Sequence, residues 1–174
     1  MSVESLAQAI RDIQDFPKPG IVFKDITPVL RDANLFEDAV NLMAQPWTNT
    51  KPDAVAAIDA RGFILGGAVA YKLGVGFIPI RKEGKLPWDV DTVEYELEYG
   101  TDSVEMHSDA VASGQSILLV DDLLATGGTA KAAVELIEKS GGKVAGVQFL
   151  IELCFLNGRV GLEKYNVNSL IEEK

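Results

Sequence analysis

The chain has one cysteine and one histidine, and this scarcity excludes several kinds of site. Cys154 has no second cysteine to pair with, so an internal disulfide is excluded. Its apolar surroundings favour a small buried side chain. With His107 as the only histidine, neither a usual zinc site nor a histidine-based catalytic triad has enough parts. We expect His107 at a strand end and assign it no role.

Long apolar runs are also missing. None approaches the ~20 residues needed to cross a bilayer. The first residues, Met1 to Glu4, lack the basic and apolar regions of a signal peptide. We therefore expect a cytoplasmic protein with no membrane partner. A length of 174 residues suits one domain, spanning residues 1–174.

Positive charge is scarce, since 16 Lys and Arg face 26 Asp and Glu, giving a net charge of −10. Proteins that bind nucleic acid carry basic faces, so we expect no nucleic-acid partner. An acidic chain that captures an anion must concentrate its cations locally. One segment stands out in this respect, the run from Arg81 to Lys85, which contains Arg81, Lys82 and Lys85. The alternative interpretation of this run is a solvated charged loop.

The most informative stretch follows a predicted buried strand, Ile117–Val120. Two aspartates, Asp121 and Asp122, come directly after it, and a helix-prone run covers 130–139. Between them lies a loop of small and hydroxylated residues: Ala125, Thr126, Gly127, Gly128 and Thr129. Free N–H groups and the dipole of the following helix favour an anion at such a loop. The sequence therefore predicts a phosphate site there.

The paired carboxylates suggest what else the ligand carries. Asp121 and Asp122 would repel a bare phosphate, whereas ribose hydroxyls or a divalent cation such as Mg²⁺ suit them. A ribose 5-phosphate would satisfy both parts of the stretch. Neither the P-loop motif nor the dinucleotide-binding glycine motif occurs in the chain. The alternative is a tight turn between a strand and a helix with two surface aspartates.

Short apolar runs alternate with helical patterns along the chain, which predicts an α/β fold. Such alternation is typical of a doubly wound, mainly parallel sheet flanked by helices. We expect a first helix containing Val3, Leu6, Ile10 and Ile13, an extended segment at 16–30, and a second helix around 35–43 capped by Asp32. Strands are expected at 54–58, 76–80, 117–120 and 144–150, with helices at about 63–73 and 130–139.

Ligands of parallel sheets bind beyond the carboxyl ends of the strands. Asp59, Arg81 and Asp121 each follow a predicted strand, so we expect their loops to converge. Arg61 and Gly62 lead into a helix, which suits a second phosphate site with a bidentate arginine. The alternative for Arg61 is an ion pair with a surface acid.

A β-hairpin interrupts the sheet pattern. Val93, Tyr95, Leu97 and Tyr99 alternate with glutamates, residues 100–102 supply a turn, and alternation resumes after it. A hairpin beside a binding site is a candidate lid, and we assign about 82–106 to it. Most glutamates on its polar face are expected to be only solvated.

The 121–129 stretch resembles the phosphoribosyl pyrophosphate motif of the type I phosphoribosyltransferases. Three further segments, at 16–27, 81–87 and 95–100, narrow the resemblance to the adenine phosphoribosyltransferase family. The resemblance covers nearly the whole chain. It implies a homodimer in purine salvage that makes AMP and pyrophosphate from adenine and phosphoribosyl pyrophosphate, with Mg²⁺ held mainly through the substrate. No side chain is assigned as a metal ligand.

The resemblance also implies a role for each site residue. Asp121 and Asp122 would face the ribose, 125–129 the 5-phosphate, and Arg61, Arg81, Lys82 and Lys85 the pyrophosphate. The N-terminal segment, about 1–30, would form a hood over adenine. There Phe23 would stack on the base, Val22 and Lys24 would contact it through the backbone, and Leu123 would pack on its other face. Glu98 would be the catalytic carboxylate.

Two other functions stay open on the sequence alone. One is a phosphoribosyltransferase for another purine, such as xanthine or hypoxanthine. The other is a non-catalytic regulator that senses phosphoribosyl pyrophosphate. A regulator of that kind would need a face that binds nucleic acid, and the acidic composition argues against one.

Overall fold

The computed structural model describes residues 2–96 and 100–174. Within these residues, seven strands form one sheet in the order β5-β6-β4-β3-β7-β8-β9, and β1 and β2 form a separate hairpin. The strands are β1 (Arg11–Gln14), β2 (Val22–Asp25), β3 (Ala54–Ile58), β4 (Gly76–Lys82), β5 (Val90–Glu96), β6 (Thr101–His107), β7 (Ser116–Leu124), β8 (Lys143–Leu153) and β9 (Val167–Glu173). The helices are α1 (Val3–Ala9), α2 (Thr27–Arg31), α3 (Ala33–Ala44), α4 (Arg61–Leu73) and α5 (Gly128–Lys139), with short 3-10 turns η1 (Gln45–Trp47) and η2 (Cys154–Leu156).

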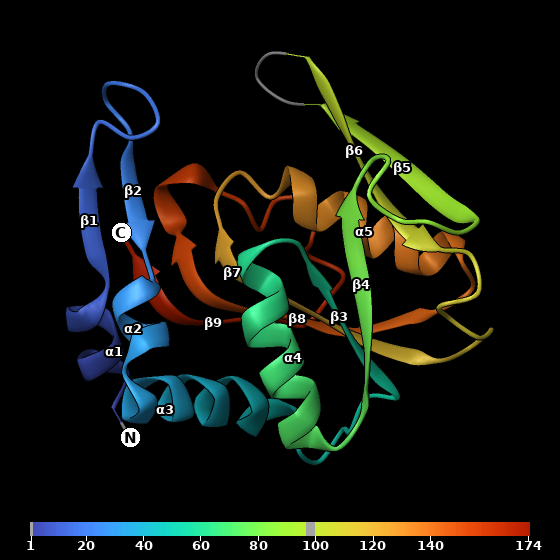
Figure 1. The fold of residues 1–174 in the computed structure, drawn as a ribbon, viewed down its shortest axis with the longest axis horizontal. Helices are drawn as coiled ribbons and strands as arrows, with labels where there is room; N and C mark the ends of the chain where they lie inside the picture. The colour runs from blue at the N-terminus through green and yellow to red at the C-terminus, as the bar shows by residue number, and fades with distance from the viewer. Residues whose placement is uncertain (1, 97–99) are drawn as a thin grey trace.

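The centre of the large sheet is parallel. β3 pairs in parallel with β4 on one side and with β7 on the other, and β8 and β9 continue in parallel beyond β7. β6 is antiparallel to both β4 and β5. The hairpins β1–β2 and β5–β6 lie on opposite sides of the molecule, with α4 and β7 between them (Figure 1). The prediction of a mainly parallel sheet flanked by helices is confirmed.

The two faces of the sheet belong to two cores. On β3, Ala56 and Ile58 pack in one core with α5, whereas Val55 and Ala57 pack in the other with α1 to α4. Alternate side chains of a strand point to opposite faces, so β3 is buried on both. This double burial explains why β3 is an uninterrupted apolar run in the sequence.

Local signals account for the helix boundaries that the sequence predicts well. Asp32 caps α3, because its carboxylate accepts the N–H groups of Asn34 and Leu35 at 2.9 and 3.1 Å. Gly74 ends α4 with a φ of 68°, a left-handed conformation that favours glycine. The strand expected at 54–58 coincides with β3.

The N-terminal segment differs from the prediction. The first helix ends at Ala9, and Ile13 lies instead in β1, opposite Phe23 of β2. The segment expected to be extended over 16–30 contains β2 but also the helix α2, which has proline in its first turn. Ile10 is the residue that caps the end of α1, and Ile13 leaves the helical pattern because β1 pairs with β2.

Several strands are longer than predicted. β4 runs through Lys82, and β7 continues through both aspartates to Leu124, so neither Arg81 nor Asp121 begins a loop. β6 begins at Thr101, inside the expected turn. β9 was not predicted, and it extends the sheet beyond β8. No helix in the described part of the chain combines the length and the apolarity that a membrane span requires.

Helix α4 packs closely against the sheet at Gly66, so a larger residue at this position should destabilise the fold. A Cβ on Gly66 would lie 2.5 Å from the Cβ of Ala57. We expect Gly66→Ala to lower the free energy of unfolding by about 1–3 kcal/mol, since the core has no room for the methyl group. Urea unfolding followed by circular dichroism measures this change.

The neighbouring residue supplies the control. A Cβ on Gly67 would meet no atom within 4 Å. Gly67→Ala should therefore raise the free energy of unfolding by up to about 1 kcal/mol, because alanine favours the helix. Equal stabilities of the two variants would contradict this account of the contact between α4 and β3.

Candidate active site

A cavity of about 300 Å³ lies at the carboxyl edge of the sheet, between β7 and α5. It is lined by residues that follow β3, by the end of β4, and by the stretch from β7 into α5. The three strands are neighbours and parallel, so their carboxyl ends open on the same side. The structure therefore brings these predicted site residues together: Arg61, Lys82, Asp121, Asp122, Leu123, Ala125, Thr126, Gly127, Gly128 and Thr129.

The loop between β7 and α5 curls tightly around this cavity. Gly127 has a φ of 83°, which is accessible mainly to glycine, and α5 begins at Gly128. The N–H groups of the first turn of a helix have no partner within the helix. Thr126 and Thr129 add hydroxyl groups beside them. The loop is thus suited to holding an anion.

The segment after β8 packs against this loop, a contact that the sequence did not predict. A Cβ on Gly127 would lie 2.2 Å from the carbonyl oxygen of Gly158, and one on Gly158 would lie 2.2 Å from that of Ala125. Arg159 fixes the segment through two bonds to the buried Glu152, at 2.6 and 2.7 Å. Asn157 and Gly158 are a turn signal in the sequence, but their contact with a loop some thirty residues earlier in the chain has no local signal.

The paired aspartates occupy the floor of the cavity. Nε of Arg61 lies 2.8 Å from Oδ2 of Asp122, close enough for an ion pair. That oxygen nevertheless accepts no hydrogen bond within the described chain. Oδ1 of Asp121 accepts the backbone N–H of Asp122 at 2.9 Å. Both aspartates line the cavity, and a carboxylate has lone pairs for more than one donor.

Burial changes the acidity of both carboxyl groups. Desolvation raises the pKa of Asp121 well above its ordinary value, and the neighbouring charge of Asp122 raises it further. Desolvation also raises the pKa of Asp122, although the charge of Arg61 opposes this shift. Hydroxyl donors or a cation would stabilise the ionised forms, so the free site is electrostatically unfavourable.

Arg61 connects the aspartates with the N-terminal hairpin. It begins α4, and its guanidinium lies 4.8 Å from the ring centroid of Phe23 on β2. The ion pair that was the alternative interpretation of Arg61 is therefore present, but its acid is the buried Asp122 of the cavity and not a surface residue. The guanidinium thus covers one face of the Phe23 ring, and Phe23 is not among the residues that line this cavity. Phe16 packs against the same ring edge-on, with centroids 5.2 Å apart.

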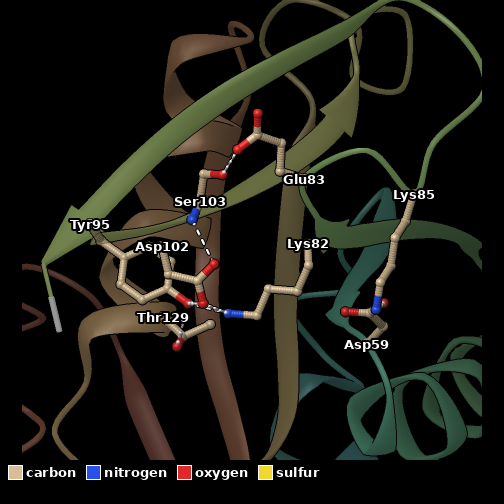
Figure 2. Close-up of polar contacts among 8 residues, drawn as sticks. All are labelled: Asp59, Lys82, Glu83, Lys85, Tyr95, Asp102, Ser103 and Thr129. Atoms are coloured by element: carbon tan, nitrogen blue, oxygen red, sulfur yellow. Dashed lines mark hydrogen bonds and ion pairs between the residues drawn. The ribbon is translucent and has the colours of Figure 1, made fainter. Parts of the chain in front are cut away.

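The other predicted cations lie along the end of β4 and the loop after it. Nε of Arg81 lies 3.1 Å, and Nζ of Lys85 3.7 Å, from the same oxygen of Asp59. Lys82 lines the cavity and contacts Asp102 of β6, as Figure 2 shows. Each of these cations therefore has a carboxylate partner within the chain.

A second cavity, of about 560 Å³, lies under the N-terminal hairpin. Val22 and Lys24 of β2 line it together with Phe155 and Leu156, and Thr126 lines both cavities. The ammonium of Lys24 is bound to Asp12 and Glu173, at 2.9 and 3.2 Å. Since the side chain of Lys24 is engaged elsewhere, its backbone is what it offers to a ligand. Glu98 lies outside the described residues.

Comparisons with known proteins agree with the predicted family. Residues 30–164 match the family model described as the phosphoribosyl transferase domain. The adenine phosphoribosyltransferase of Thermoanaerobacter sp. (strain X514) is 54% identical over 172 residues, which are 99% of each chain. The chain belongs to the adenine phosphoribosyltransferase family. The predicted subfamily is thereby confirmed.

Solved structures of relatives support the same assignment. The enzyme of Thermoanaerobacter pseudethanolicus is 53% identical with a TM-score of 0.97, covering 99% of this chain and 100% of that one. The enzyme of Saccharomyces cerevisiae is 38% identical with a TM-score of 0.90, covering 97% of each chain. The fold described above is thus that of adenine phosphoribosyltransferases.

The raised pKa of Asp121 predicts a pH-dependent stability. The folded state holds the Asp121 proton more tightly than the unfolded state, so ionisation lowers stability as the pH rises through the raised pKa. Asparagine does not ionise and can still accept the Asp122 N–H. We expect Asp121→Asn to be more stable than the unaltered chain near neutral pH by about 0.5–2 kcal/mol.

The difference should shrink as the pH falls toward about 4, where the unfolded carboxyl group also becomes protonated. Urea unfolding at a series of pH values measures it. The matched control is Asp109→Asn, on an exposed residue, which should change stability little at any pH. A destabilised Asp121→Asn at neutral pH would show that the Asp121 charge is well compensated in the free protein.

Proposed function

We propose that this chain transfers the phosphoribosyl group of phosphoribosyl pyrophosphate to adenine, giving AMP and pyrophosphate in purine salvage. The observation that carries the proposal is the pair of adjoining cavities. The first cavity contains the loop 125–129, which we call the anion cradle, and the carboxylates of Asp121 and Asp122. The second cavity lies under strand β2, and Thr126 lines both cavities. A phosphorylated sugar and a flat base would need this arrangement side by side. The yeast relative was solved with an imino-altritol bisphosphate and adenine.

The sugar phosphate suits the cavity of about 300 Å³. In the proposal, the 5-phosphate binds the residues 125–129 through backbone N–H groups and hydroxyls. Asp121 and Asp122 accept the ribose hydroxyls, and the position of both residues in the cavity lining supports this role. Arg61, Arg81, Lys82 and Lys85 stabilise the leaving pyrophosphate, whose negative charge grows as the bond to the sugar breaks.

Adenine suits the junction of the two cavities, where Thr126 lines both, Leu123 lines the first, and Val22 and Lys24 line the second. Phe23 stacks on one face of the base in the proposal, and Leu123 packs on the other. Within the described chain, β1 and β2 form a two-stranded sheet, so one edge of β2 carries backbone groups without a strand partner. The backbone groups of Val22 and Lys24 would read the amine and ring nitrogens of adenine. Glu98 would accept the adenine proton or balance the positive charge on the sugar.

Mg²⁺ fits the donors that the site offers. It prefers oxygen ligands, keeps several waters, and binds one or two carboxylates together with substrate phosphates. Residues 2–96 and 100–174 contain no cluster of three potential metal-binding side chains, and the acids that line the cavity are Asp59, Asp121 and Asp122. The proposal therefore has Mg²⁺ held mainly through the substrate, where it would neutralise phosphate charge.

The remaining parts of the proposal rest on family membership. Residues 1–174 would form one domain, with the hood at about 1–30 and the lid at about 82–106. The chain would also form homodimers and act in the cytoplasm.

Assaying nucleotide formation tests the activity directly. The chain is incubated with phosphoribosyl pyrophosphate and one free base at a time, and the products are separated by chromatography. We expect AMP from adenine, little product from hypoxanthine or xanthine, and loss of activity when a chelator removes Mg²⁺. Product from another purine at a similar rate, or none from adenine, would contradict the proposed function.

Replacing Phe23 tests the base site. Phe23→Ala should raise the KM for adenine by about 5- to 100-fold, which corresponds to a stacking energy of about 1–3 kcal/mol. The KM for phosphoribosyl pyrophosphate should stay within about twofold. Tyr71→Ala is the control, because Tyr71 is an exposed aromatic residue that lines neither cavity. Similar losses for both substrates would instead identify Phe23 as structural.

A further inference from the structure

Lys82 is held by two residues of the β5–β6 hairpin. Its ammonium contacts the carboxylate of Asp102 and the hydroxyl of Tyr95. The Tyr95 hydroxyl donates to Asp102 at 3.0 Å and accepts from Oγ1 of Thr129 at 3.3 Å. Figure 2 shows these side chains meeting between the hairpin, β4 and the start of α5. The network therefore joins the hairpin to two residues that line the cavity, Lys82 of β4 and Thr129 of α5.

Strand β6 also binds Glu83 and Gly84, the two residues that follow Lys82. Ser103 donates its hydroxyl to Glu83 at 2.9 Å, and buried Glu105 accepts the backbone N–H of Gly84 at 2.9 Å. The backbone of the loop is thus anchored independently of Asp102. Replacing the Asp102 carboxylate should alter the environment of Lys82 without releasing the loop.

The contact between Lys82 and Asp102 is exchangeable. Their side chains are 34% and 32% exposed, so water and dissolved anions reach the pair. Burial opposes the charge of Lys82, but its bonds to Asp102 and Tyr95 outweigh this effect and raise its pKa. The bond to Lys82 lowers the pKa of Asp102. Both groups are therefore charged at neutral pH, and the carboxylate cancels much of the field that Lys82 would present to an anion in the cavity.

We propose that Asp102 is a positioning residue that competes with pyrophosphate for Lys82 and so sets how tightly the site holds that anion. This inference rests on the proposed function, in which Lys82 contacts the pyrophosphate. A pyrophosphate oxygen near Lys82 also lies near the Asp102 carboxylate, which repels it. Weaker retention would favour release of the pyrophosphate product. Tyr95 keeps the ammonium near Thr129, so the cation stays at the cavity wall when it leaves Asp102.

Calorimetric titration with pyrophosphate in the presence of Mg²⁺ tests the competition. Asp102→Asn keeps the size of the side chain and removes its charge. We expect it to bind pyrophosphate about two- to fivefold more tightly, the factor typical of a partly exposed ion pair. Asp102→Ala, which also removes the hydrogen bonds, should change the affinity in the same direction. Unchanged or weaker binding by both variants would overturn the proposal.

Two further variants separate local competition from other effects. Glu94→Gln removes one negative charge from an exposed position on the same hairpin, and it should leave the affinity within experimental error. If Glu94→Gln tightened binding as much as Asp102→Asn, the gain would come from net charge and the proposal would fail. The gain should also disappear when Asp102→Asn is combined with Lys82→Met. Persistence of the gain in this double variant would show that Asp102 does not act through Lys82.

Lys82→Met alone distinguishes this proposal from the proposed function. It should weaken pyrophosphate binding. If the unaltered chain did not bind pyrophosphate, or if Lys82→Met had no effect, Lys82 would not contact the pyrophosphate. Both the role of Lys82 in the proposed function and the competition by Asp102 would then be wrong. Weaker binding by Lys82→Met without a gain in Asp102→Asn would overturn the competition alone.

Discussion

The parallel pairing of β3 with β7 determines where the candidate site lies. Ala57 is opposite Val120 in this register, so the chain leaves β3 toward Arg61 beside the two aspartates that continue β7. β4 joins the other side of β3 and brings Lys82 to the same edge. The anion cradle needs no special long-range contact to meet these groups, because parallel strands carry their following loops to one side. The N-terminal hairpin reaches this edge through Arg61, which contacts both Phe23 and Asp122.

Local pairing of charges, rather than the net charge of −10, governs how this acidic chain can bind an anion. The cations predicted for the site each face an acid: Arg61 faces Asp122, Arg81 and Lys85 face Asp59, and Lys82 faces Asp102. These pairs hold long, flexible side chains near the cavity in the free protein. They also weaken the positive potential there, so an entering phosphate group gains less than the number of cations suggests. Mg²⁺ would offset this balance by arriving with the substrate.

The sequence predicts the elements whose cause is local. β3 is an uninterrupted apolar run, Asp32 is a capping residue, and the glycines of the cradle belong to a recognisable motif. Elements that depend on partners far away in the chain cannot be predicted from local sequence patterns. Ile13 continues a helical spacing but pairs with Phe23, and β9 exists because β8 offers it an edge. The support of the cradle by Gly158 is likewise a contact between segments far apart in the chain. Residue types at the site could therefore be predicted, but the partners that hold them could not.

The division between core and edge explains how the fold tolerates an unfavourable site. Two apolar cores, one on each face of the sheet, bury side chains along β3 and β7 up to the point where Asp121 begins the polar edge. Apolar burial there contributes most of the stability, since it scales with the area removed from water. The edge can then hold two desolvated carboxylates and a cradle with no space for a methyl group at Gly127. A ligand that donates hydroxyls to those carboxylates relieves their desolvation, so part of its binding energy comes from a cost already present in the free protein.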